Sequence, residues 1–190
     1  MIICGIDSGL KNFAISIINY EETLKENLSN LPEIIYINKF NLLENYDNKN
    51  KNIYIEKKII DILDNINKDY KIKLLVLEQQ LKIASNNYEI MTICMTWALI
   101  NNIDLKIKSP RNKYKIIGLE STFKSYRNLK EKSEEFIKDK YNDSNYFINN
   151  IEKFNKQDDI TDSIFIILQY ILDDTKIIDK NEDVEIVMDK

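Results

Sequence analysis

Acidic residues stand at the ends of two apolar runs that have the composition of buried strands. The run Leu74–Leu77 leads directly into Glu78, and the run Ile2–Ile6 leads into Asp7. A short apolar run bounded by polar residues is typical of a strand that is buried on both faces. In open α/β sheets, ligands bind at the carboxyl ends of such strands. Taken alone, each stretch fits a strand that simply ends at a solvated carboxylate at least as well as it fits a ligand-binding site.

A third group of acidic residues opens the last strongly amphipathic segment of the chain. Asp159 and Asp162 are three residues apart and Asp158 lies four before Asp162, so these side chains share one side of a helix. Acidic residues in a first turn also favour the helix dipole. That ordinary role explains Asp158 well, but it explains Asp162 less well, because Asp162 lies at the edge of the apolar face.

Together, the three acidic groups predict a metal-dependent reaction on phosphate esters. Carboxylates that converge from neighbouring strands repel one another unless a cation neutralises them. Hard oxygen ligands favour Mg²⁺, for which Mn²⁺ commonly substitutes. Two such ions about 4 Å apart can activate water and stabilise the leaving oxygen of a phosphodiester. The chain contains no His, which excludes Ser-His-Asp triads, His-containing zinc sites and imidazole acid–base catalysis.

The hydrophobic pattern predicts an α/β domain with a mixed sheet, three antiparallel strands coming first. Gly9 permits a tight turn between the first two strands. Ser85 is expected to cap a helix, and residues 111–125 are expected to form an irregular loop. The predicted strands are 2–7, 13–18, 34–40, 73–78 and 104–108, and the predicted helices are 53–66, 85–101, 126 or 128 to 141, and 157–172.

Length and composition predict one soluble intracellular domain. The 190 residues are 44% hydrophobic and 31% charged, as in ordinary globular proteins. No basic leader precedes the first apolar run, and no apolar run approaches the roughly 20 residues that span a membrane. Cys4 and Cys94 are expected to be buried and reduced. We expect the domain to cover residues 1–173 and a frayed acidic tail to cover 174–190.

The charge is unevenly distributed along the chain. The net charge is −4, yet residues 105–140 contain eleven basic and five acidic residues, a local excess of six positive charges. Such asymmetry favours a basic face for a polyanion, although a solvated surface of a lysine-rich chain explains it equally well. Within or near this segment, Lys113, Lys115, Tyr126 and Arg127 are candidates for contact with nucleic acid.

Four motifs in order resemble those of the poxvirus-type Holliday junction resolvases, which are RuvC-like nucleases of the RNase H-like superfamily. Residues 6–12 (Ile-Asp-Ser-Gly-Leu-Lys-Asn) look like their first motif and residues 77–80 (Leu-Glu-Gln-Gln) like their second. Residues 125–133 (Ser-Tyr-Arg-Asn-Leu-Lys-Glu-Lys-Ser) resemble their basic segment. Residues 156–163 (Lys-Gln-Asp-Asp-Ile-Thr-Asp-Ser) look like their last motif.

This resemblance implies an RNase H-like mixed β-sheet flanked by α-helices, and a viral enzyme of DNA recombination. Its implied activity is that of a magnesium-dependent endodeoxyribonuclease that resolves four-way (Holliday) DNA junctions by paired symmetric nicks. Carried over by position, the metal ligands are Asp7, Glu78, Asp159 and Asp162, and the catalytic helper lysine is Lys130 or Lys132. A viral member of the family would act where viral DNA replicates in the infected cell.

The two-fold symmetry of a four-way junction implies a homodimer. The segment containing Ile90, Met91, Met95 and Trp97 is either a dimer face or part of the core.

Three alternative functions remain. The chain fits another RNase H-like nuclease that cuts RNA–DNA hybrids or other branched DNA, and it fits a junction-binding protein that does not cleave. An actin-like phosphate binder built on residues 7–9 is nearly excluded, because that fold needs a second glycine-rich loop and the chain has three glycines.

Overall fold

The sheet of the protein has five strands in the order β3-β2-β1-β4-β5. The computed structural model describes residues 1–21, 31–47, 50–110 and 126–182. Strands β1 (Ile2–Ser8), β2 (Phe13–Asn19) and β3 (Glu33–Phe40) are antiparallel neighbours. Strands β4 (Leu74–Glu78) and β5 (Asp104–Lys108) continue the sheet beyond β1 in parallel. The mixed sheet that the sequence predicts is therefore confirmed, with each strand within one or two residues of its predicted range.

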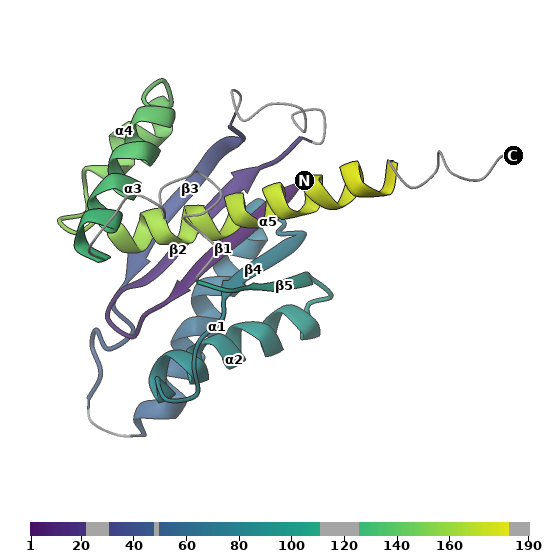
Figure 1. The fold of residues 1–190 in the computed structure, drawn as a ribbon. Coiled ribbons are helices and arrows are strands. Elements are labelled where there is room, and N and C mark those ends of the chain that lie inside the picture. The colour runs from purple at the N-terminus through teal and green to yellow at the C-terminus, as the bar shows by residue number, and fades with distance from the viewer. Residues whose placement is uncertain (22–30, 48–49, 111–125, 183–190) are drawn as a thin grey trace, which may run out of the picture.

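Helices cover both faces of the sheet (Figure 1). Helices α1 (Lys51–Tyr70) and α2 (Ser85–Ile100) lie on one face, while α3 (Tyr126–Lys140), α4 (Asn145–Ile151) and α5 (Asp158–Glu182) lie on the other. Alternate residues of each strand supply the two cores, as strand geometry requires. In β1, Ile3 packs toward α5 and Cys4 and Ile6 pack toward α1 and α2.

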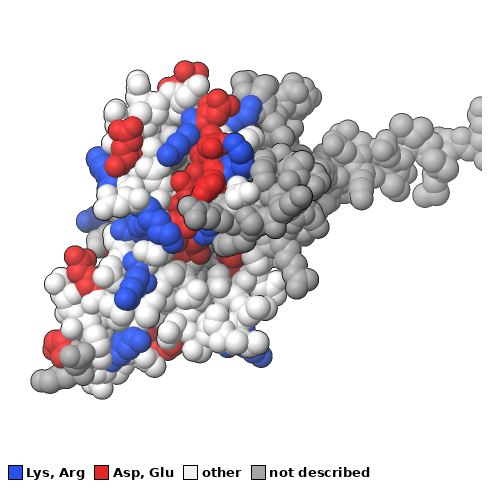
Figure 2. Space-filling model, turned by 60° about the vertical axis from the view of Figure 1, so that its left-hand side comes forward, with Lys and Arg blue, Asp and Glu red and all other residues white. Residues whose placement is uncertain are grey.

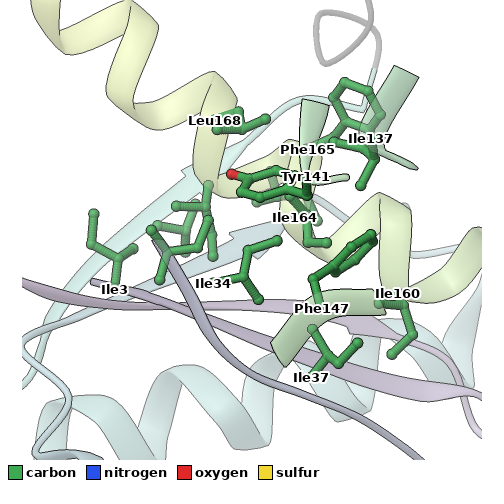
Figure 3. Close-up of a cluster of buried hydrophobic side chains, with 14 of the residues drawn as sticks. Ile3, Ile34, Ile37, Ile137, Tyr141, Phe147, Ile160, Ile164, Phe165 and Leu168 are labelled. Atoms are coloured by element: carbon green, nitrogen blue, oxygen red, sulfur yellow. The ribbon is translucent and has the colours of Figure 1, made fainter. Parts of the chain in front are cut away.

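Helix α5 crosses the strands and contacts all five of them (Figure 1). Its buried face meets the sheet and the helices α3 and α4 in one apolar cluster (Figure 3). The labelled members of this cluster are Ile3, Ile34, Ile37, Ile137, Tyr141, Phe147, Ile160, Ile164, Phe165 and Leu168. This packing ties the acidic first turn of α5 to the sheet.

Gly5 permits the closest approach of α5 to the sheet. A Cβ atom on Gly5 would lie 2.3 Å from the backbone oxygen of Ser163 and 2.6 Å from Cγ1 of Ile167, both far inside van der Waals contact. Beside this point, the hydroxyls of Ser16 on β2 and Ser163 on α5 share a buried hydrogen bond of 2.5 Å. The missing side chain of Gly5 therefore sets the height of α5 above β1.

The structure corrects three expectations from the sequence. Helix α4 was not predicted; Ser144 caps it by accepting a 3.3 Å hydrogen bond from the Phe147 amide, and Phe147 and Ile151 are buried. Ser85 is not a cap, because Ala84 precedes α2 and provides no side-chain hydrogen bond. Helix α5 continues to Glu182, so its predicted end at residue 172 is wrong, while residues 183–190 lie outside the described residues.

The expectation for the cysteines is confirmed. Cys4 and Cys94 are fully buried, neither forms a disulfide, and burial raises the pKa of both thiols. They act as small apolar side chains in the core under α1 and α2.

Within the described ranges, no helix is both long enough and apolar enough to cross a membrane.

Candidate active site

Asp7 and Glu78 project from adjacent parallel strands toward α5. The register between β1 and β4 pairs Ile6 with Leu77, so the next position places Asp7 beside Glu78. Side chains alternate between the two faces along a strand, so residues an even number of positions apart face the same side. Ile3 on β1 and Val76 on β4 pack in the cluster under α5, and Asp7 and Glu78 therefore face that side too. Both residues are half-buried at the carboxyl edge of the sheet. The predicted pairing of these two carboxylates thus follows from strand register.

The first turn of α5 and the residue that follows it carry three buried aspartates. Asp158, Asp159 and Asp162 are exposed by 6%, 8% and 4%, values that are rare for carboxylates without charge partners. Ser163, the neighbour of Asp162, is the residue whose backbone touches Gly5 on β1. Since Asp7 lies two residues beyond Gly5 on the same face of the strand, the first turn of α5 and the end of β1 meet on one side of the sheet.

Lys130 lies among these aspartates, and Lys132 does not. The Nζ atom of Lys130 on α3 is 2.7 Å from Oδ2 of Asp158 and 3.4 Å from Oδ2 of Asp162. Lys132, on the exposed side of α3, pairs instead with Glu135 in its own helix. Of the two lysines that the sequence left open, Lys130 is therefore the one that the fold brings to the acidic residues.

Two further lysines, which the sequence analysis did not select, neutralise the same turn. Lys39 at the end of β3 places its Nζ atom 3.4 Å from Oδ2 of Asp159. Lys156, just before α5, places its Nζ atom 3.2 Å from Oδ2 of Asp158 and 3.9 Å from Oδ1 of Asp159. Figure 2 shows acidic residues in a column with basic residues on both sides. On this face the charges are interleaved rather than gathered into one broad basic surface.

The aspartates respond differently to this environment. Burial raises the pKa of Asp159, and the neighbouring charge of Asp158 raises it further. Burial alone would also raise the pKa of Asp158, but hydrogen bonds from Lys130 and Lys156 and their charges outweigh it, so this pKa lies below its usual range. The Asp159 carboxylate is therefore the less fully compensated of the two, and added positive charge would stabilise its ionised form.

The donor set fits a hard divalent cation in its chemistry. Four carboxylates from two strand ends and the start of one helix lie on the same side of the sheet, and Oδ1 of Asp158 is buried without a hydrogen-bond partner among the described residues. Carboxylate oxygens are the ligands that Mg²⁺ and Mn²⁺ prefer. The side chains are not gathered into a finished centre, because no group of three or more acidic or cysteine side chains in the described part of the chain is arranged to hold a metal. Lysine ammonium groups contact Asp158, Asp159 and Asp162 instead.

Other residues that the sequence singled out lie elsewhere. Ile90, Met91 and Trp97 are buried in the core under α1 and α2, and Met95 packs against it, so of the two interpretations the core is confirmed for these residues. Trp97 also donates a 2.7 Å hydrogen bond to Asp64 on α1. Tyr126 and Arg127 belong to α3, but their side chains are outside the described part of the structure, as are residues Lys113 and Lys115 entirely.

Lys130→Met tests whether Lys130 supports the acidic turn. This variant leaves Asp158 and Asp162 buried with less positive charge around them, and we expect the free energy of unfolding to fall by about 1–3 kcal/mol. Lys132→Met, which breaks only a surface pair on the same helix, should change it by less than about 0.5 kcal/mol. Urea denaturation measures both; equal effects of the two variants would contradict the placement of Lys130.

Comparison with known proteins gives concordant matches over almost the whole chain. The model of the family described as Poxvirus A22 protein matches residues 1–174. The Holliday junction resolvase of fowlpox virus (strain NVSL) is 30% identical over 174 residues, which cover 90% of this chain and 92% of that protein. The sequence resemblance is confirmed by these matches.

The fold comparison agrees. The crystal structure of the fowlpox virus Holliday junction resolvase has a TM-score of 0.63 and 27% identity, covering 90% of this chain and 97% of that one. RuvC of Thermus thermophilus has a TM-score of 0.62 at 9% identity, covering 87% of this chain and 90% of that chain, a likeness of fold alone. The RNase H-like fold expected from the sequence is confirmed.

Proposed function

The chain belongs to the Poxvirus A22 protein family, and from this membership we propose that it is an endonuclease that resolves four-way DNA junctions. One solved structure similar to this chain is described as a complex of the fowlpox virus resolvase with Holliday junction DNA. The observation within this chain that carries the proposal is the convergence of Asp7, Glu78 and the first turn of α5 on one side of the sheet.

In this proposal, Asp7, Glu78, Asp159 and Asp162 hold Mg²⁺, for which Mn²⁺ substitutes. When bound, divalent cations of this kind lower the pKa of water and stabilise the charge on the leaving oxygen of a phosphodiester. Asp7 and Glu78 are fixed by strand pairing, whereas Asp159 and Asp162 are fixed by the packing of α5. The carboxylates therefore come from rigid elements, which suits a site whose geometry must hold through the reaction.

Lys130 supplies a positive charge at the site. Its ammonium is held by Asp158 and lies 3.4 Å from Asp162, with 21% of its side chain exposed. It is thus close enough to the carboxylates to donate to a phosphate oxygen positioned there, and accessible enough to be reached by it. A fixed ammonium beside a reacting phosphate stabilises negative charge that develops during cleavage.

Removing one carboxylate tests the activity. We expect the wild-type protein to make paired nicks in a synthetic four-way junction with Mg²⁺ or Mn²⁺ and none with chelator, leaving a matched linear duplex intact. Asp7→Asn should slow nicking at least about 100-fold, because it removes a ligand of the reacting centre. Asp104→Asn, which changes an exposed carboxylate at the opposite edge of the same sheet, should leave the rate unchanged.

The outcomes separate the candidate functions. Equal cutting of duplex or of an RNA–DNA hybrid would indicate a general RNase H-like nuclease. Junction binding without cleavage under either metal would favour a non-cleaving binder and contradict the enzyme. Unimpaired cleavage by Asp7→Asn would contradict the carboxylate site.

We also propose that the enzyme acts as a homodimer, since paired cuts in a two-fold symmetric junction require two active sites. Exposed apolar residues available for such contact lie at the end of α2 and on α1, where Ile100 is 74% exposed, Leu99 65% and Ile60 40%. Sedimentation equilibrium should give twice the 22.5 kDa chain mass at micromolar concentration, and Ile100→Lys should lower the dimer fraction. A monomer that still makes paired cuts would contradict this arrangement.

A further inference from the structure

Lys39 occupies a defined place in the sheet relative to the acidic residues. Register pairs Asp7 on β1 with Ala14 on β2, and Ala14 with Lys39 on β3, so the three residues form one row across the strands. Ala14 lies in the cluster under α5, so this row faces α5. Because Ala14 is small and fully buried, Lys39 and Asp7 flank the same narrow part of the sheet surface below the first turn of α5.

The ammonium of Lys39 is held by two groups at the start of α5. It donates a 2.6 Å hydrogen bond to the backbone carbonyl of Lys156 and lies 3.4 Å from Oδ2 of Asp159. Its side chain is 15% exposed, and that of Asp159 is 11% exposed, so water screens this pair only weakly. The carbonyl of Lys156 belongs to the backbone and does not change charge, so it keeps the ammonium in place whatever else binds Asp159.

Lys39 differs from the other two lysines in the carboxylate that it serves. Lys130 contacts Asp158 and Asp162, and Lys156 lies nearest Asp158 and is mostly exposed. Asp159 has positive charge from both Lys39 and Lys156, and Lys39 is the closer and the more buried of the two, at 3.4 Å against 3.9 Å. A divalent cation at Asp159 would take over this neutralisation and would at the same time be repelled by the ammonium beside it.

We propose that Lys39 is a positioning residue that serves as the built-in counter-charge of Asp159 and competes there with the divalent cation. The proposal rests on Asp159 being a metal ligand, as in the proposed function. Lys39 balances the charge of Asp159 and keeps the start of α5 docked on β3 before metal binds. As a consequence, it lowers the affinity of the site for the cation that replaces it.

Lys39→Met isolates this role, since methionine keeps much of the chain length without the charge. Two readouts apply: Mn²⁺ binding by calorimetry and the melting temperature in chelator. We expect Lys39→Met to bind Mn²⁺ at least about fivefold more tightly than the wild type, because a positive charge close to the ion is removed. Its melting temperature in chelator should fall, and saturating Mn²⁺ should raise it by more than in the wild type.

Two matched variants separate this effect from a general loss of stability. Lys39→Arg retains the charge and should keep the wild-type Mn²⁺ affinity. Lys58→Met removes a lysine that likewise binds backbone carbonyls, those of Asn41 and Glu44, away from the acidic turn. It should lower the melting temperature without changing Mn²⁺ affinity.

The outcomes distinguish this inference from the proposed function. Suppose that the wild type binds Mn²⁺ and that Asp159→Asn weakens this binding. If Lys39→Met then binds Mn²⁺ no more tightly than the wild type, the role of Lys39 is overturned and the metal site stands. If the wild type does not bind Mn²⁺, or if Asp159→Asn does not alter its binding, both the role of Lys39 and the proposed metal site are overturned.

Discussion

The contact between Gly5 on β1 and the backbone of α5 at Ser163 determines where the acidic residues of this protein meet. With no side chain at Gly5, α5 comes so close that the backbone oxygen of Ser163 lies 2.3 Å from where a Cβ would stand. The Ser16–Ser163 hydrogen bond fixes the helix laterally at the same height. Asp162 directly precedes Ser163 on the helix, Asp158 and Asp159 lie one turn earlier, and Asp7 lies two residues beyond Gly5 on the strand. A larger residue at position 5 would lift the helix and separate its carboxylates from those of the sheet.

Charge compensation is the second condition of this arrangement. Three buried aspartates within the first five residues of α5 repel each other, and burial penalises each of them. Ammonium groups from three parts of the chain compensate these negative charges: Lys39 on β3, Lys130 on α3 and Lys156 in the segment before α5. These lysines hold α3 and β3 to the start of α5, and their charge favours the ionised forms of Asp158 and Asp159.

Much of this architecture follows from local sequence. The apolar runs that end at Asp7 and Glu78 have strand composition, and parallel pairing of β1 with β4 then places the two carboxylates side by side. Helix α5 was predictable from its repeat of Ile160, Ile164, Ile167, Leu168 and Ile171, all buried in the structure. Helix α4 was not predicted because it has seven residues and buries only Phe147 and Ile151, which is too few apolar positions to show a helical repeat.

The partners of the aspartates could not be read from the sequence. Lysine is common throughout the chain, so Lys39 carried no local signal; its position depends on the pairing of β3 with β2 across a connection that lies partly outside the described residues. Asp158 looked like an ordinary residue of a first helical turn, yet it holds Lys130 and Lys156 because α3 docks beside it. Lys130 and Lys132 are alike in sequence and differ only in which side of α3 they occupy. These roles arise from tertiary packing.

The most direct test of the account is to locate Mn²⁺ by anomalous X-ray scattering in crystals of the protein soaked with the ion. The account predicts a peak bound by Asp7 and by at least one of Glu78, Asp159 and Asp162, at the roughly 2.0–2.3 Å typical of small divalent ions and carboxylate oxygens. Saturated crystals with no peak between β1 and the first turn of α5, or with ions bound only elsewhere, would contradict it.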